Sequence, residues 1–516
     1  MTGAPDTGSL GPVYRISLGV VIVLAFSLRI WALNVGLPPW VDPDEQQVVC
    51  SAMGFGSDAT PRAPNGNVVA TYLSSLSYAA YYGVGRAIGR FDSFLDFGSA
   101  FFHAPRPFYM IARLLVLAAG LLSVYLAFLV GLRLRGRSLG LVLSMLVAVH
   151  PLAIEHAHQA QSHGFAVALI LFGCWVVLSP RRGIETIASD LTFGFCLGLA
   201  TEAMPACLLL FPAYLAYRAA TPRPWHPGAV MPPLLAGLGA LWVGMWTVGT
   251  GANLLSAAWG NLGACARLHL SMAPVWLAGT GMLVLGLSCL LHRRLPSSTT
   301  AAATLAGGLL LVWPALRTSV EYNAVRSVPP PTALAATWIS QHLPTGSTIV
   351  VDPDGLAGLD LRRTGESWRR ELTCADVALG YPQRHSRAYC LVGMHAAGSY
   401  SGPAFDVVLL PTPRAGDPSR QSASAIARTL HTPVQYIVTS QAARPPLDLL
   451  PLRNDAPEGR EECWLVARFA GTDSRSDGVT IWATPAAVPG AAPPEPVPWL
   501  VRQAPDLALL RIPSAS

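Results

Sequence analysis

The sequence contains no lysine, since all 35 basic residues of its 516 are arginine. This absence excludes chemistry that depends on a lysine amine, such as Schiff-base catalysis or the phosphate-binding lysine of a P-loop. The nine cysteines include no C-x-x-C pair. Four of them, Cys174, Cys196, Cys207 and Cys289, lie in apolar runs and are expected to be packing residues. Cys374, Cys390 and Cys463 fall in the polar C-terminal third, where an extracytoplasmic location would allow one disulfide.

Charge is scarce as well, at 12% of residues, whereas 52% are hydrophobic and the mean hydropathy is +0.42. This balance predicts an integral membrane protein rather than a soluble enzyme. The formal charge of +6 is small for the length of the chain, and the arginines are scattered along it. Nucleic acid is therefore not an expected partner.

Apolar runs recur along the first two thirds of the chain, and a membrane helix needs roughly 20 such residues. We expect about nine spans by this reasoning. They fall at 13–33, 108–132, 138–154, 163–179, 187–202, 204–219, 229–249, 273–291 and 299–316. Arginines mark alternate connections, and the positive-inside rule places those connections in the cytoplasm. We therefore predict a multi-pass plasma-membrane protein with a cytoplasmic N-terminus and an extracytoplasmic C-terminal part.

The predicted topology gives an α-helical polytopic membrane protein with an extracytoplasmic α/β domain. The first outer loop is too long for a simple link, and the tyrosines of residues 68–88 suit a helix lying on the membrane surface. Those tyrosines are Tyr72, Tyr78, Tyr81 and Tyr82. The predicted divisions are a transmembrane module over 1–316 with its outer loop at 34–107, a linker at 317–331, an α/β domain over 332–483 and a Pro/Ala-rich tail at 484–516.

Three acids stand within four positions just past the outer end of the first apolar run, in Asp42-Pro43-Asp44-Glu45. Ionised carboxylates so close to hydrocarbon are unfavourable unless they are paired, hydrated or functional. Asp44 could equally be a polar loop residue or a helix N-cap after Pro43, and Glu45 a solvated loop charge. Asp42 is best explained as a turn residue.

Several motifs occur in an order that matches one family. Pro43-Asp44-Glu45 lies in the first outer loop, and a tyrosine-rich outer segment follows it. Arg113 opens the second span, and the next outer turn reads HPLAIEHAHQAQS. Gly198-Leu199-Ala200 precedes a further outer turn, and Ala335–Ser347 has the pattern A-x-x-W-I-x-x-x-x-P-x-G-S. Over roughly residues 13–355, the chain resembles the polytopic glycosyltransferases with a GT-C fold, and most of all the dolichyl-phosphate-mannose–protein mannosyltransferase-like family.

The resemblance implies that a sugar is transferred from a polyprenyl-phosphate carrier to an extracytoplasmic protein, glycan or lipid. It also implies that Asp44 is the general base that takes the proton from the acceptor hydroxyl, which is suitable chemistry for a carboxylate beside a partly dry cleft. Glu45 would orient the acceptor or hold a water or cation. Direct in-line attack by the activated hydroxyl would invert the anomeric carbon.

Arginine is the strong cation available for the departing phosphate, because its guanidinium binds phosphate oxygens in a bidentate manner. Arg113 and Arg267 are the best placed candidates, although arginines near helix ends also extend to the interface without a functional role. In the histidine-rich turn, His156, His158 and His163 are expected to make polar contacts with sugar or phosphate, or to be interfacial hydrogen-bonding residues. Their spacing is not a zinc signature, so no cofactor and no divalent cation is indicated.

Two positions depart from the family pattern. His163 stands where many relatives have the aspartate of a Thr-Asp pair, and Glu202 lies where relatives often carry lysine. We count both as substrate-binding candidates, since they are expected to face the cleft. The departures keep open a catalytically inactive relative that binds lipid-linked sugar or acts as a scaffold. A polytopic transporter is the other alternative, although the sequence has no internal repeat.

Overall fold

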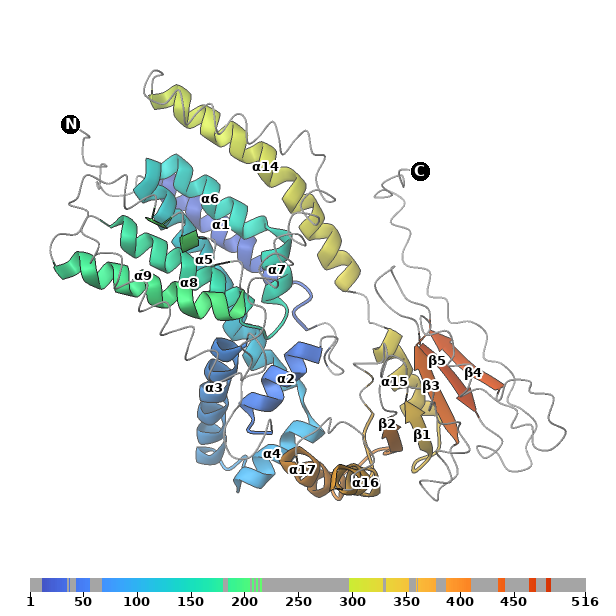
Figure 1. Cartoon of the computed structure of the whole chain (residues 1–516). Coiled ribbons are helices and arrows are strands. Elements are labelled where there is room, and N and C mark those ends of the chain that lie inside the picture. Colours follow the sequence, from blue (N-terminus) through green and yellow to red (C-terminus); the bar gives the residue numbers. More distant parts are fainter. Residues whose placement is uncertain are drawn as a thin grey trace, which may run out of the picture. The chain divides into compact units, whose positions relative to one another are not determined.

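The computed structural model describes most of the first two hundred residues and parts of the remainder. The described residues are 12–34, 37, 43–55, 67–179, 184–204, 207, 210–211, 214–215, 297–327, 331–351, 359, 361–376, 387–409, 435–440, 464–469 and 479–483. Contacts divide the chain into two compact units (Figure 1). The first comprises Met1–Val35, Asp44–Ala87 and Pro107–Ser327, and the second comprises Gly36–Pro43, Ile88–Arg106 and Val328–Ser516.

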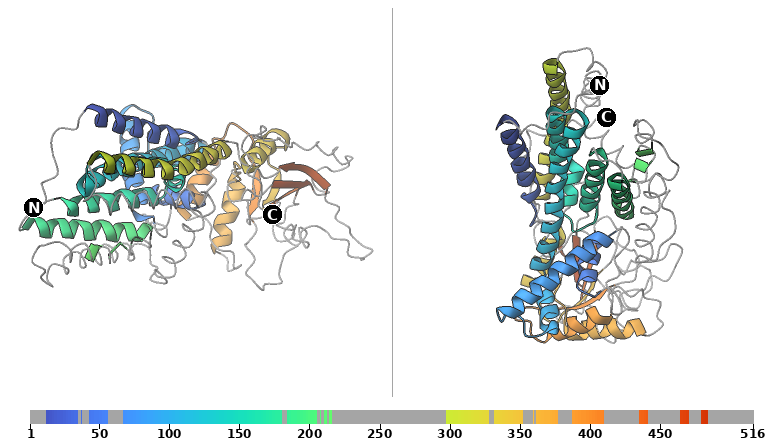
Figure 2. Two further views of the ribbon diagram at one scale, coloured as in Figure 1. Left: turned by 90° about the horizontal axis from the view of Figure 1, so that it is seen from above. Right: turned by 90° about the vertical axis from the view of Figure 1, so that its left-hand side faces the viewer.

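The first unit is helical over its described residues. Its helices are α1 (Pro12–Ile30), α2 (Pro43–Ala52), α3 (Val68–Ala87), α5 (Arg106–Arg135), α6 (Arg137–Val149), α7 (Pro151–Ala157), α8 (His163–Leu178), α9 (Ile184–Ala203) and α14 (Ser297–Arg326). Helix α6 packs against both α1 and α14, and α8 packs against α9 (Figure 2). These pairings bring the last described helix of the unit beside its first.

Two described helices, α1 and α5, are long and apolar enough to cross a membrane. A third crossing results if α6 and α7, which are bent by 57°, count as one span. Apolar side chains cover the outer face of α1, among them Val13, Ile16, Val20 and Val23. Such a face requires an apolar surrounding, as in a membrane protein. The predicted spans at 229–249 and 273–291 lie outside the described residues, so the total of nine stays a prediction.

The bend between α6 and α7 follows from the sequence His150-Pro151. Proline lacks an amide hydrogen, and its ring disfavours helical geometry at the residue before it. His150 is accordingly extended, with φ −66° and ψ 121°, while Pro151 occupies the first position of α7. The break leaves carbonyl groups of the last turn of α6 without helical partners.

Helix α3 presents apolar side chains outward and polar ones inward. Leu76 and Val84 are exposed, whereas Thr71 and Ser74 are buried. The prediction that Tyr78 faces the interface is wrong, because this residue is buried and its hydroxyl donates to the Phe108 carbonyl oxygen at 2.9 Å. The Tyr78 ring packs edge-on against the ring of Phe108. For this tyrosine, packing in the protein interior is therefore favoured over a place at the membrane interface.

The second unit contains one mixed sheet in the order β2-β1-β3-β5-β4. Its strands are β1 (Thr348–Val351), β2 (Asp406–Leu409), β3 (Tyr436–Ser440), β4 (Trp464–Phe469) and β5 (Val479–Ala483). β1 is parallel to β2 and β3, whereas β5 is antiparallel to β3 and β4. All four residues of β1 are buried, as expected of a central parallel strand whose sequence is Thr-Ile-Val-Val.

Helix α15 (Pro331–His342) supplies one side of the core of this unit. Its Ala335 and Ile339 are buried in a cluster with Ile349 of β1, Phe405 and Val438 of β3. The linker predicted at 317–331 is wrong over 317–326, which continue α14 to Arg326. An i,i+4 ion pair between Arg317 and Glu321 supports this last part of the helix, and it explains why charge here did not end the helical structure.

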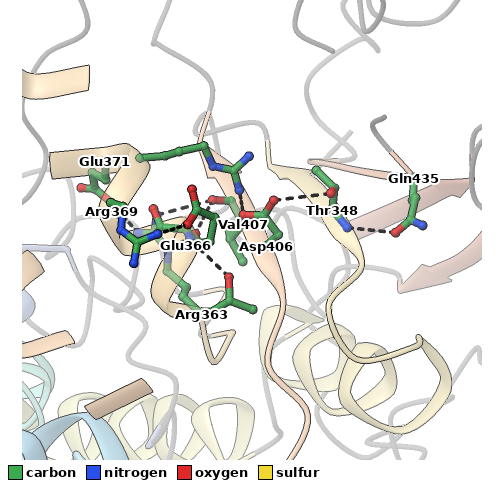
Figure 3. Close-up of polar contacts among 11 residues, drawn as sticks. Thr348, Arg363, Glu366, Arg369, Glu371, Asp406, Val407 and Gln435 are labelled. Carbon is green, nitrogen blue, oxygen red and sulfur yellow. Dashed lines mark hydrogen bonds and ion pairs between the residues drawn. The ribbon is translucent and has the colours of Figure 1, made fainter. Parts of the chain in front are cut away.

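Polar side chains cover the outer edge of β2. Arg363, which precedes α16 (Gly365–Asp376), donates to the Val407 carbonyl oxygen at 3.4 Å (Figure 3). Ser367, in the first turn of α16, donates to the same oxygen at 2.8 Å. Arg363 also pairs with Glu371. Because an open strand edge is a template for unwanted pairing, these contacts protect the sheet from association.

A helix from the segment predicted as the first outer loop belongs to the second unit. α4 (Phe94–His103) packs against α17 (Arg387–Ala397). Phe102 lies edge-on to Trp368 at 5.7 Å between ring centroids and 4.7 Å from Tyr389. The predicted loop over 34–107 therefore contributes to both units, and the predicted α/β domain is incomplete without residues near 100.

Gly393 of α17 is required by the Trp368 ring. A Cβ at this position would lie 2.8 Å from Trp368 Cε2. We expect Gly393→Ala to lower the free energy of unfolding of the second unit by about 1–3 kcal/mol, as overpacking usually does. Thermal unfolding of the full chain in detergent measures this, with Gly398→Ala as the control, since its Cβ would meet only the His395 carbonyl oxygen at 3.5 Å. Equal melting temperatures for the two variants would show that the Trp368 ring shifts to admit the methyl group with no loss of stability.

Candidate functional site

The two acids Asp44 and Glu45 lie in the first turn of α2 but have opposite surroundings. Proline is favoured at the start of a helix, and acids in the first turn interact well with the helix dipole. Asp44 is exposed, whereas Glu45 is fully buried. Successive helical residues point about 100° apart, so a helix that buries Glu45 can leave Asp44 at the surface.

Glu45 forms a buried bidentate ion pair with Arg113 of α5. The Nε and Nη2 atoms of Arg113 lie 2.6 and 2.7 Å from the two carboxylate oxygens, and both side chains have 0% exposure. The remaining nitrogen, Nη1, donates to the Leu33 carbonyl oxygen at 2.7 Å. The Ala160 amide donates to Glu45 at 3.1 Å. Helices α2 and α5, the end of α1 and the turn after α7 therefore meet at one carboxylate.

The turn after α7 is also tied to the start of α3. The Ser162 amide donates to Asn67 Oδ1 at 2.8 Å, and the Ser162 hydroxyl accepts from the Ala70 amide at 3.0 Å. Glu202 Oε1 accepts from the Val68 amide at 3.3 Å. Ser162 and Glu202 thus satisfy amide groups of the first turn of α3 that have no partner within the helix. The predicted role of Glu202 toward substrate stays a prediction; its second oxygen, Oε2, is buried and has no hydrogen-bond partner within the described residues.

His158 is buried and neutral. Its Nε2–H donates to the Arg29 carbonyl oxygen at 2.9 Å, and its ring lies parallel to that of Tyr322 with 6.1 Å between centroids. Burial and, next in size, the positive charge of Arg326 together lower the pKa of His158 to about 3. An imidazole held in this way acts as a hydrogen-bonding group and does not become charged near neutral pH.

His156 and His163 lie together on the other side of the turn. Their rings stack at 4.6 Å between centroids, with an angle of 10° between planes. The Nδ1–H of His163 donates to Gln161 Oε1 at 3.1 Å. Within the described ranges no group of three His, Cys, Asp or Glu side chains is arranged to hold a metal ion. Arg267 lies outside the described residues.

Three polar residues that the sequence analysis did not single out connect the broken helix, α1 and α14. Arg29, fully buried near the end of α1, donates to the Ala148 and Val147 carbonyl oxygens at 2.8 and 2.9 Å. From α14, Ser319 donates to the Val149 carbonyl oxygen at 2.7 Å and Asn323 to that of Leu28 at 2.8 Å. The sequence did contain a signal for Arg29, because an arginine within an apolar span is rare without a function or a partner.

Comparison with known proteins yields structural likeness alone. No protein-family model and no curated protein matches the chain. An oligosaccharyltransferase from Archaeoglobus fulgidus, solved with Zn and sulfate, is 9% identical over 82% of this chain and 68% of that chain, with a TM-score of 0.34. The archaeal oligosaccharyltransferase AglB from the same organism, solved with an inhibitory peptide and a dolichol-phosphate, is 9% identical over 83% and 69%, with a TM-score of 0.37. At such identities and TM-scores, the likeness assigns no role to any residue of this chain.

Proposed function

We propose that this chain is a membrane glycosyltransferase of the GT-C type, with Asp44 as its general base. It would transfer a sugar from a polyprenyl-phosphate-linked donor to an extracytoplasmic protein, glycan or lipid. The observation that carries the proposal is that an exposed acid directly precedes a buried acid held in an ion pair. Asp44 is accessible to an acceptor, and the neighbouring Glu45 is locked to Arg113 inside the protein.

This arrangement supports catalysis because it fixes the position of the base. A carboxylate on a rigid helical turn can meet the acceptor hydroxyl in one orientation, which lowers the entropy lost on reaching the transition state. The hydroxyl oxygen would attack the anomeric carbon as its proton passes to Asp44. The bond between the anomeric carbon and the phosphate oxygen would break, and the polyprenyl phosphate would leave with the electron pair.

In this proposal Glu45 and Arg113 act as positioning residues. The Arg113 nitrogens donate to Glu45 and Leu33, so the guanidinium supports the turn that bears Asp44. His156, His163 and Glu202 surround the neighbouring turn and remain proposed substrate contacts. Arg267 remains a proposed phosphate contact.

Mass spectrometry of lipids that purify with the protein tests the function. We expect a polyprenyl-phosphate sugar with the wild-type chain and more of it with Asp44→Asn, because the variant binds the donor but cannot activate the acceptor. Transfer should fall by about a hundredfold or more, as is usual for loss of a general base. Glu366→Gln is the control, since this exposed carboxylate pairs with its neighbour Arg369 on α16.

Absence of isoprenoid phosphate from both folded proteins would count against the proposal. Transport assays on reconstituted protein would then be the next step. Donor bound equally by both proteins, with no transfer by either, would instead support an inactive relative that binds lipid-linked sugar.

A further inference from the structure

Tyr322 and Arg326, one turn apart near the end of α14, carry hydrogen-bond donors for which the described residues offer no acceptor. Arg326 Nη1 donates to the Tyr322 hydroxyl oxygen at 2.5 Å, and its guanidinium carbon lies 5.8 Å from the centre of the ring. Both side chains are half-buried. Since the phenol accepts this bond, its own O–H remains a donor, and a guanidinium has four further N–H groups. No acidic partner of Arg326 lies within the described part of the chain.

The pair belongs to the site around Glu45. The Tyr322 ring lies parallel to that of His158, whose Nε2–H holds the end of α1. After burial, the charge of Arg326 is the largest influence that lowers the pKa of His158, and Arg113 contributes as well. Arg326 and Arg113 therefore both lie within electrostatic range of His158.

The other arginines here are already committed. Arg113 has 0% exposure and donates to Glu45 and Leu33, and Arg29 is fully buried against backbone carbonyls. Arg326 is the half-buried cation among these three. Two neighbouring donors, one of them charged, suit an anion with several oxygens, and a guanidinium matches phosphate geometry.

We infer that Tyr322 and Arg326 form a phosphate-binding pair for the isoprenoid phosphate of the donor. The inference rests on the proposed function and extends it to residues outside the predicted site. Arg326 would hold the phosphoryl oxygens, and Tyr322 would fix the guanidinium and add one donor. As the bond to the sugar breaks, the growing negative charge on the phosphate would be stabilised by both.

The test measures binding of a synthetic polyprenyl monophosphate to the full chain in nanodiscs of neutral lipid. The same polyprenol without phosphate and phosphatidylglycerol serve as comparison ligands. We expect Arg326→Gln to weaken phosphate binding about tenfold to a hundredfold, and Tyr322→Phe about threefold to tenfold. Arg317→Gln is the matched control, because it removes an exposed, ion-paired arginine from the same helix; its affinity should stay within about twofold of wild type.

Each result has a distinct meaning. If wild type prefers the phosphate and Arg326→Gln binds it equally well, the pair is not the phosphate site, although the proposed function stands. If wild type binds polyprenol and its phosphate alike, both the function and the pair are overturned. If Arg326→Gln loses phosphatidylglycerol to the same extent, the pair serves bilayer lipid and the donor assignment is wrong. Arg326→Lys, which keeps the charge, should recover part of the affinity and so distinguishes ligand binding from a folding defect.

Discussion

Glu45→Gln should lower the free energy of unfolding of the first unit by about 3–5 kcal/mol, the usual result of removing one partner from a buried ion pair. The substitution hardly changes the shape of the side chain. It nevertheless replaces a carboxylate oxygen by an amide NH₂, which would oppose a donor of Arg113 now 2.6–2.7 Å away. The charge of Arg113 would remain where its side chain has 0% exposure. Thermal unfolding in detergent should report a large drop in melting temperature.

Two further variants separate the ion pair from general damage. Glu366→Gln removes a carboxylate that is 57% exposed and paired with Arg369, so its cost should stay below about 1 kcal/mol. The double variant Glu45→Leu, Arg113→Met removes both charges and should be more stable than Glu45→Gln, because no unpaired charge remains. Recovery would be partial, since the Leu33 carbonyl and Ala160 amide lose their partners. A melting temperature of Glu45→Gln equal to wild type would contradict the buried pair.

The Glu45–Arg113 ion pair could be predicted from the sequence only in part. Both partners were selected as candidate site residues, Glu45 because acids beside a membrane span are unfavourable without a role, and Arg113 because a guanidinium suits a departing phosphate. Their direct contact could not be deduced, since it joins positions 68 residues apart. Which acid turns inward depends on how α2 packs, and a helix start after Pro43 alone does not fix that rotation.

The same limit explains the corrections elsewhere. Tyrosine suits both an interface and a core, and only the neighbouring Phe108 carbonyl decides the place of Tyr78. Helix α15 begins at Pro331, whereas the charge at Arg317 is neutralised by its i,i+4 partner Glu321 and does not interrupt α14. The docking of α4 against α17 depends on aromatic contacts between residues nearly 300 positions apart. Local pattern carries no information on such contacts.

Arg29→Leu is the second substitution from which we expect a large effect. The Arg29 guanidinium donates hydrogen bonds to carbonyl oxygens in the last turn of α6, next to the break at Pro151. These carbonyl oxygens have no water to replace the lost donor in the interior of a membrane protein. Each lost hydrogen bond to a buried acceptor costs about 1–3 kcal/mol. Loss of both bonds should therefore destabilise the first unit by about 2–5 kcal/mol. This range allows for one compensating gain, because leucine carries no charge that must be desolvated on burial.

The controls for Arg29 follow from its position. Arg15→Leu changes an exposed arginine of the same helix and should leave the melting temperature nearly unchanged. Arg29→Lys should fall between leucine and wild type, because one ammonium cannot reproduce the fork of a guanidinium. Gly120→Ala, whose Cβ would lie 3.1 Å from Arg29 Nε, should displace the side chain and imitate a mild form of Arg29→Leu.

The break also connects Arg29 to the site, which gives its loss a second consequence. The turn after α7 holds Glu45 through the Ala160 amide, and His158 in that turn holds the Arg29 carbonyl oxygen. If the carbonyls of α6 lose their partner, α7 is free to rotate about the break and to withdraw Ala160 from Glu45. Arg29→Leu should therefore reduce sugar transfer in protein that is still folded, whereas Gly393→Ala should lower stability without that loss. Equal transfer per folded molecule in both variants would limit Arg29 to a role in stability.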